Sequence, residues 1–170
     1  MSIGRVEVVQ GDLTKIEADA IVNAANEGLA QGGGVCGAIF KAAGAAELTR
    51  ACQEVGSCPT GSAVITPAFD ISSAKFIIHA VGPIYAQYQP AQARQLLRSA
   101  YQSAIDLAGE HNCQSIAFPA ISTGIYGYPL EEACAEAVAV CEAASASKAI
   151  HIKLVAFDNR TAECLRSHLP

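Results

Sequence analysis

The fold is decided by Gly32-Gly33-Gly34-Val35-Cys36-Gly37-Ala38-Ile39, a stretch that follows closely on Val22-Asn23-Ala24-Ala25-Asn26. A β-branched run ends in Asn-Ala-Ala-Asn, three glycines follow, and an apolar segment of helical character then begins. Glycine has no Cβ atom, so its backbone can adopt positive φ and let another group approach closely. A strand, a glycine loop and a helix N-terminus bring free N–H groups and the positive end of a helix dipole together, which suits a phosphate or diphosphate. A linker or tight turn is the alternative, and the buried character of both flanks argues against it.

A second loop of the same kind lies far downstream. An apolar run from Ser115 to Ile121 is typical of a buried strand, and it is followed by Ser122-Thr123-Gly124-Ile125-Tyr126-Gly127-Tyr128-Pro129 before a long helical pattern. In open α/β sheets, ligands bind beyond the carboxyl ends of the strands, where such loops meet. Neither loop continues into Gly-Lys-Ser/Thr and neither has GxGxxG spacing, so neither is a P-loop or a dinucleotide-binding fingerprint.

Length and composition indicate a single globular domain over residues 1–170. Hydrophobic residues make up 51% of the chain and charged residues 16%, which supports a substantial core and argues against disorder. The formal net charge of −5 lacks the basic footprint of nonspecific nucleic-acid binding, so nucleic acid is not an expected partner. The first residues contain no apolar signal core and no stretch is long enough to cross a membrane, so we expect a cytoplasmic protein.

The seven cysteines are irregularly spaced and no two form a CxxC pair, which argues against a zinc site. Most are expected to be small buried residues in a reducing compartment. Cys134 and Cys141, seven residues apart on a predicted helix, fit this role. Cys36 is the exception because it lies in the glycine loop. It could act as a nucleophile at a helix N-terminus or line a pocket as a small side chain, and we favour the second interpretation.

Apolar patterning predicts six strands and five helices. The strands are expected at 5–9, 19–23, 63–66, 76–81, 115–120 and 150–157. The helices are expected at 37–43, 46–55, 90–108, 129–141 and 161–169. Strands and helices alternate except at the two adjacent strands that contain Val64 and Phe76. This order predicts an α/β fold, a three-layer α/β/α sandwich with a mixed, mainly parallel six-stranded sheet.

Few polar side chains stand out as candidates for chemistry. His79 lies inside an apolar strand, where a hydrogen-bonded core histidine is expected, and no Ser-His-Asp arrangement follows from the spacing. Asp12 is either a turn residue or a carboxylate that accepts hydrogen bonds from an exocyclic amine such as that of adenine. Asn26 carries both a donor and an acceptor, which suit the vicinal hydroxyls of a ribose. With the two glycine loops, these residues suggest a nucleotide diphosphate as ligand.

Four segments, in this order, resemble the macrodomain, or ADP-ribose-binding, family over nearly the whole chain. They are Gly11-Asp12-Leu13-Thr14 with Asp19 to Asn26, Gly32 to Ile39, Ile77-Ile78-His79-Ala80-Val81-Gly82-Pro83, and Pro119-Ala120-Ile121-Ser122-Thr123-Gly124-Ile125-Tyr126. The resemblance implies a macrodomain fold that binds ADP-ribose and ADP-ribosylated proteins, and it requires no metal and no organic cofactor.

The resemblance also implies roles for individual residues. Asp12 and the backbone of Leu13 would contact the adenine, with Phe157 and Asn159 near it. Asn26 would hold the distal ribose, and Tyr126 would close over it. The diphosphate would be cradled by two loops, made of Gly33, Gly34 and Val35 and of Ser122, Thr123, Gly124, Ile125 and Tyr126.

One position departs from the hydrolytic members that this chain resembles. Those members often carry Gly-Gly-Gly-Val-Asp-x-Ala-Ile-His, in which the Asp is implicated in activating water, whereas this chain has Cys36 and Phe40 at the Asp and His positions. Macrodomains of alphaviruses resemble this chain in carrying Gly-Val-Cys, and they hydrolyse ADP-ribosyl esters. The resemblance therefore implies hydrolysis of ADP-ribosylated carboxylates or O-acetyl-ADP-ribose, with Asn26 and Cys36 at the reacting end. The alternative is a reader module that binds ADP-ribose without turnover.

Overall fold

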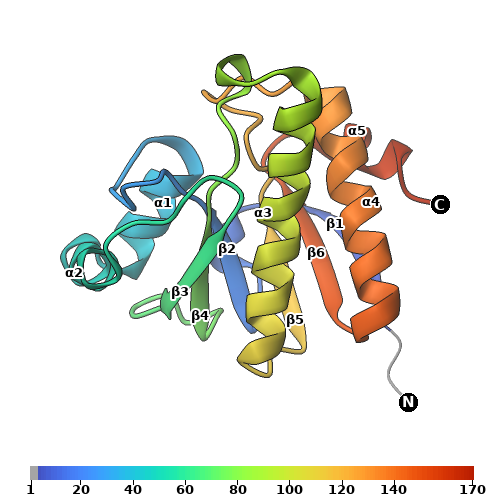
Figure 1. The fold of residues 1–170 in the computed structure, drawn as a ribbon. Helices are drawn as coiled ribbons and strands as arrows, with labels where there is room; N and C mark the ends of the chain where they lie inside the picture. The colour runs from blue at the N-terminus through green and yellow to red at the C-terminus, as the bar shows by residue number, and fades with distance from the viewer. Residues whose placement is uncertain (1–3) are drawn as a thin grey trace.

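The computed structural model describes residues 4–170, in which a six-stranded sheet lies between two layers of helices (Figure 1). Met1 to Ile3 lie outside the described residues. The prediction that the first residues contain no apolar signal core falls partly on them. The strands are β1 (Val6–Gln10), β2 (Ala20–Ala24), β3 (Ala63–Pro67), β4 (Phe76–Ala80), β5 (Ser115–Phe118) and β6 (His151–Ala156). The helices are α1 (Gly34–Ala43), α2 (Ala45–Val55), α3 (Pro90–Glu110), α4 (Leu130–Lys148) and α5 (Asn159–Ser167), with short 3₁₀ helices η1 (Leu13–Lys15) and η2 (Tyr85–Gln87).

The strands lie in the order β1-β6-β5-β2-β4-β3, and every neighbouring pair is parallel except β3 with β4. No helix separates β3 from β4 in the chain, so these two strands can pair antiparallel. By contrast, β5 and β6 are parallel neighbours and are joined through α4. The predicted three-layer sandwich with a mixed, mainly parallel six-stranded sheet is confirmed.

The sheet separates two hydrophobic cores, because successive side chains along a strand point to opposite faces. Ile21 and Ile77 pack with α1 and α2 on one face, whereas Val22 and Ile78 pack with α3, α4 and α5 on the other. All four side chains are fully buried, as expected for central strands of a sheet covered on both faces. Among the described residues, no helix has the length and apolar character needed to span a membrane.

Most element boundaries agree with the sequence-based expectation to within a few residues, and three differences bear on the site. α1 begins at Gly34, inside the glycine run and not after it. Asp12 caps the 3₁₀ helix η1, where only a turn was expected. α5 begins at Asn159, earlier than expected, because the Asp158 carboxylate accepts a backbone N–H of the first turn and caps the helix.

Candidate functional site

The loops that carry the predicted site residues all leave the same edge of the sheet. β1, β2, β4, β5 and β6 are parallel to one another, so their carboxyl ends point to one side. These ends are Gln10, Ala24, Ala80, Phe118 and Ala156. Ligands of open α/β sheets bind beyond this edge. The topology therefore gathers segments that are far apart in the sequence.

The first turn of α1 presents backbone N–H groups with no side chain over them. Gly33 precedes the helix without making a side-chain capping bond, and the first turn contains no acidic residue. The N–H groups of a first turn have no partner within the helix and lie at the positive end of its dipole. Gly34 has a φ of 57°, a conformation that favours glycine, and a Cβ on Gly33 would meet no atom within 4 Å. An anion can approach the backbone here.

The loop between β5 and α4 has an uncommon backbone conformation at Ser122. Its φ is 69°, and its carbonyl accepts a hydrogen bond from Tyr128 N at 2.9 Å. The Ser122 hydroxyl is buried and has no hydrogen-bond partner among residues 4–170. A Cβ on Gly82, just after β4, would lie 2.2 Å from that hydroxyl, so the close approach requires glycine. Buried hydroxyls without partners are rare, and a ligand phosphate or a water would satisfy this one.

Tyr101, on the apolar face of α3, supports the same loop. Its hydroxyl donates to Pro119 O at 3.3 Å and accepts from Ile121 N at 3.1 Å. Complete burial raises the pKa of this phenol, so it stays protonated. The backbone just before Ser122 is therefore tied to α3. No sequence signal distinguishes this tyrosine from an ordinary core residue.

Asn26 is half-buried and uses its side-chain amide to close its own loop. Its Nδ2 donates to Ala30 O at 2.9 Å, and its Oδ1 accepts from Ala30 N at 3.0 Å. A side-chain amide can donate two hydrogen bonds and accept two, so a donor and an acceptor are left for a ligand. The side chain predicted to hold a ribose is therefore fixed in orientation.

Cys36 faces the same loop and is nearly enclosed. It is 7% exposed, and its thiol donates to Ala30 O at 3.7 Å. His79 is sealed in the core, with its ring nitrogens 3.0 Å from Asn23 Nδ2 and Thr66 Oγ1, and burial lowers its pKa to about 4. The prediction that His79 is a hydrogen-bonded core histidine is confirmed. The Cys36 thiol packs against a backbone carbonyl, and His79 is buried in the core, where it cannot serve as the base of that thiol. This favours Cys36 as a residue that lines the site and not as a nucleophile.

A carboxylate missed in the sequence lies at this end of the site. Glu27 Oε2 accepts hydrogen bonds from the N–H and the hydroxyl of Thr60, both at 3.1 Å. The pKa of Tyr126 is raised, first by burial and then by the charges of Cys36 and Glu27. A lone Glu before a glycine carries no signal of this kind, because the contact with Thr60 spans 33 residues.

The loops after β1 and β6 lie side by side and are joined by a backbone hydrogen bond of 2.9 Å. Asp12 is exposed, and its Oδ1 accepts from the N–H of Thr14 at 3.0 Å and from its hydroxyl at 2.7 Å, which lowers the carboxyl pKa. Phe157 is 85% exposed, although large aromatic side chains are usually buried. An exposed ring and an ionised carboxylate on adjoining loops offer a flat, amine-bearing base both stacking and hydrogen bonding.

The remaining predicted residues have contrasting environments. The Leu13 side chain is buried, so only its backbone can face a ligand. Asn159 is exposed at the start of α5 and not in a loop as expected. Thr123 uses its hydroxyl on Ala120 O at 2.8 Å, whereas Ile125 is 95% exposed at the tip of its loop. The Ile125 side chain is therefore open to solvent and contributes little to the protein core.

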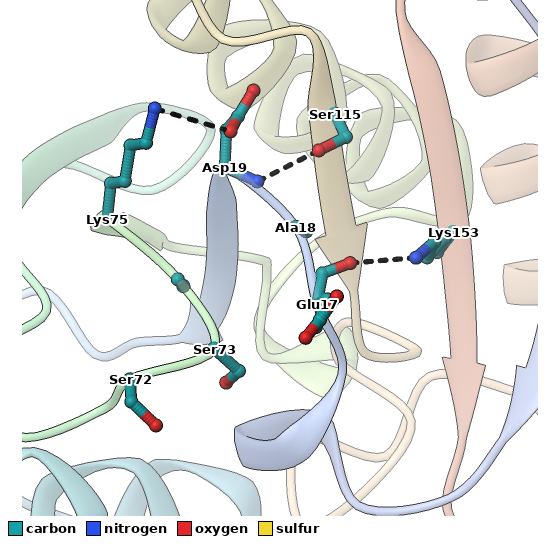
Figure 2. Close-up of a pocket in the computed structure, with 9 residues that line it drawn as sticks. Glu17, Ala18, Asp19, Ser72, Ser73, Lys75, Ser115 and Lys153 are labelled. Atoms are coloured by element: carbon teal, nitrogen blue, oxygen red, sulfur yellow. Dashed lines mark hydrogen bonds and ion pairs between the residues drawn. The ribbon is translucent and has the colours of Figure 1, made fainter.

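A shallow hollow of about 440 Å³ lies at the opposite edge of the sheet, at the amino ends of β2, β4 and β5 (Figure 2). Lys75 pairs with Asp19 Oδ1 at 3.8 Å, and the Asp19 N–H donates to Ser115 Oγ at 2.9 Å. Lys153 Nζ donates to Glu17 O at 2.7 Å. These groups are already paired and no predicted site residue lines the hollow, so it is not the candidate site.

Comparison with known proteins finds a family and relatives that are similar to this chain in sequence. The Macro domain family model matches residues 22–137, more than half of the chain. An O-acetyl-ADP-ribose deacetylase of Salmonella typhimurium is 52% identical over 138 residues, which cover 79% of this chain and 75% of the relative. A macro domain-containing protein of Vibrio parahaemolyticus is 51% identical over 142 residues, which cover 81% of each chain.

Solved structures share the fold. The Oceanobacillus iheyensis macrodomain with ADP has a TM-score of 0.90 and 40% identity, over 97% of this chain and 90% of that chain. The Trypanosoma brucei macrodomain in complex with ADP-ribose has a TM-score of 0.85 and 31% identity, over 95% of this chain and 68% of that chain. With the strand order and the family match, these similarities show that the chain belongs to the Macro domain family.

Proposed function

We propose that this chain binds ADP-ribose at the carboxyl edge of its sheet and hydrolyses ADP-ribosyl esters. One observation carries the proposal: an open helix N-terminus at Gly33 and a buried, unpartnered hydroxyl at Ser122 lie at the same edge. Helix N-termini bind phosphate through their backbone N–H groups. Relatives named O-acetyl-ADP-ribose deacetylase, and related structures with ADP or ADP-ribose, support it.

The order of the loops along the edge matches the order of the groups in ADP-ribose. β1 and β6, at one side of the sheet, are followed by Asp12 and Phe157, which suit the adenine. β5 and β2 come next, and the loops after them carry Ser122 and Gly33 for the diphosphate. The distal ribose then falls at Asn26, on the loop after β2. The ligand would therefore lie across the strand ends, with the diphosphate and the distal ribose both on the loop after β2.

Hydrolysis of a carboxylate-linked ADP-ribose breaks the bond between the anomeric carbon and the carboxylate oxygen, and water supplies the new oxygen. The carboxylate leaves as a stable anion, so positioning a water near a held sugar supplies much of the catalysis. We assign Asn26 to holding the distal ribose and Tyr126 to closing over it. Cys36 lines the site without forming a covalent bond, and the substrate's own diphosphate orients the water. This chain would then work with a thiol where the hydrolytic members it resembles have an Asp.

The test is single-turnover release of ADP-ribose from a protein ADP-ribosylated on glutamate, together with release of acetate from O-acetyl-ADP-ribose. Calorimetric titration with free ADP-ribose, run on the same preparation, separates binding from chemistry. Binding with release of either product supports the hydrolase. Binding without release of either product would reduce the function to recognition.

That second candidate, a reader module for ADP-ribosylated proteins, is favoured by the surroundings of the reacting end. His79 is sealed in the core, and the Glu27 carboxylate already accepts two hydrogen bonds from Thr60. His79 cannot act as a general base without rearrangement, and Thr60 holds one oxygen of the Glu27 carboxylate. A reader would show the same affinity for ADP-ribose and no time-dependent loss of the modification.

A further inference from the structure

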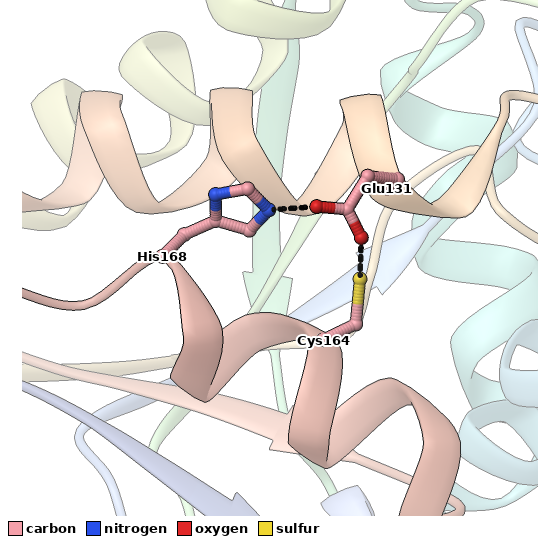
Figure 3. A group of neighbouring side chains, drawn as sticks. All are labelled: Glu131, Cys164 and His168. Carbon is pink, nitrogen blue, oxygen red and sulfur yellow. Dashed lines mark hydrogen bonds and ion pairs between the residues drawn. The ribbon is translucent and has the colours of Figure 1, made fainter.

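A separate cluster of side chains joins the two helices at the C-terminal end of the chain. Glu131, in the first turn of α4, meets Cys164 and His168 at the end of α5 (Figure 3). One oxygen, sulfur or nitrogen atom from each residue lies within 4.8 Å of the other two. Within residues 4–170, this is the only group of three or more His, Cys, Asp or Glu side chains that comes so close.

We propose that Glu131, Cys164 and His168 form a zinc-binding site. A carboxylate oxygen, a thiolate sulfur and an imidazole nitrogen are the three donor types that zinc takes in proteins. The sulfur and the nitrogen exclude Mg²⁺ and Ca²⁺, which prefer sites made of oxygen donors. Because Glu131 is 72% exposed, water can reach the fourth position of a tetrahedral ion.

The distances fit an ion between the three donors. Nε2 of His168 lies 2.8 Å from Oε1 of Glu131, and Sγ of Cys164 lies 3.1 Å from Oε2 of the same carboxylate. Zinc bonds of 2.0 to 2.3 Å place tetrahedral donors roughly 3 to 4 Å apart, so small side-chain shifts would admit the ion. The end of α5 also carries the partial negative charge of its helix dipole, which favours a cation.

The imidazole of His168 supplies an independent observation. Its Nε2 is buried and lies 2.8 Å from Oε1 of Glu131, so the imidazole and the thiol contact the same carboxylate. One ion held between these three groups would take a bond from each of them. A simple ion pair with a carboxylate as exposed as that of Glu131 would contribute little.

Zinc binding would tie the end of α5 to the start of α4. As the zinc–sulfur bond forms, the Cys164 thiol releases its proton to solvent and no electron is transferred. The three ligands stand outside the loops assigned to ADP-ribose. We therefore expect the ion to stabilise the fold and to leave ADP-ribose affinity unchanged, so this proposal and the proposed function can fail separately.

The test titrates the untagged protein, residues 1–170, with Co²⁺, whose thiolate complexes are coloured, and then displaces the Co²⁺ with Zn²⁺. We expect one bound ion per chain, a sulfur-to-cobalt charge-transfer band, and a higher Tm with Zn²⁺. Cys164→Ser should abolish the band, and Glu131→Gln and His168→Asn should each weaken binding at least tenfold. Matched controls keep the wild-type titration: Glu132→Gln, Cys113→Ser and His111→Asn, each outside the cluster.

Three outcomes would overturn the zinc site. They are no Co²⁺ binding at micromolar concentration, a charge-transfer band that persists in Cys164→Ser, and equal losses in the matched controls. If Cys164→Ser does not fold, the tenfold loss of affinity expected of Glu131→Gln becomes the test, because its side chain is largely exposed and the substitution leaves the fold intact.

Discussion

Replacing Gly33 with Glu tests the phosphate site with little disturbance of the fold. Gly33 has φ −90° and ψ −174°, an extended conformation that any residue adopts, and a Cβ there would meet no atom within 4 Å. Gly33 makes no side-chain capping bond that the substitution could remove. We therefore expect the free energy of unfolding to change by less than about 0.5 kcal/mol.

The effect on ADP-ribose binding follows from charge. The new carboxylate would extend over the α1 N-terminus, where the diphosphate with its two negative charges is proposed to lie. Two like charges 4 Å apart repel by about 1 kcal/mol in water and by about 4 kcal/mol near a protein surface. The lower value, applied to both phosphate charges, gives about 2 kcal/mol, or roughly 30-fold weaker binding. Steric exclusion adds to this, so 30-fold is the smallest loss expected.

Calorimetry with ADP-ribose and thermal denaturation supply the two readouts. Gly33→Gln has similar bulk without the charge and should bind more tightly than Gly33→Glu. Gly109→Glu adds the same charge on α3, where a Cβ also meets nothing within 4 Å, and should bind as the wild type does. An affinity of Gly33→Glu within about twofold of wild type, or ~0.4 kcal/mol, would refute a phosphate site at this loop.

Cys36→Ala should keep a measurable fraction of single-turnover hydrolysis, whereas Asn26→Ala should lose more because the distal ribose loses its anchor. An inactive Cys36→Ala protein that binds normally, with a covalent adduct on the wild-type thiol, would make this a thiol-dependent enzyme. Tyr101→Phe removes the hydroxyl that accepts a hydrogen bond from Ile121 N, so urea denaturation should show a free energy of unfolding lower by about 1 kcal/mol. Calorimetry should show weaker ADP-ribose binding. Unchanged affinity would mean that this hydrogen bond does not support the site. His79, with a folded-state pKa of about 4 against 6.5, stays neutral while the unfolded chain takes up a proton. Stability should therefore be complete above about pH 6.5 and fall by about 3 kcal/mol as the pH falls to about 4, and an NMR midpoint of this ring near 6.5 would disprove it.

The position of the candidate residues at one edge of the sheet was predictable because they follow strand-like runs. Asn26 and Ser122 come directly after apolar segments, and the carboxyl ends of parallel strands share one edge. The buried state of His79 was predictable for a similar reason, since it lies within an apolar run. The local sequence pattern is sufficient to predict a residue's environment where that environment is set by the residue's own helix or strand.

Contacts between distant segments were not predictable in this way. The Glu27 carboxylate accepts a hydrogen bond from Thr60, 33 residues away, and no local pattern connects the two. In the sequence Tyr101 has the pattern of an ordinary core residue. Only the structure shows that its hydroxyl bonds the backbone at Pro119 and Ile121. The expectation of no zinc site came from the absence of CxxC pairs, and such spacing does not reveal that Glu131 and Cys164, 33 residues apart in the chain, are in contact. Such sites depend on tertiary packing, which residue spacing does not encode.

An NMR titration of backbone amides with ADP-ribose tests most directly whether the ligand binds along the carboxyl edge of the sheet. We predict saturable shifts at Gly33 to Cys36, at Ser122 to Tyr126 and at Phe157. Amides at the opposite edge, at Asp19 and Ser115, should not move. No shifts at millimolar ADP-ribose, or shifts confined to the opposite edge, would contradict the proposed site.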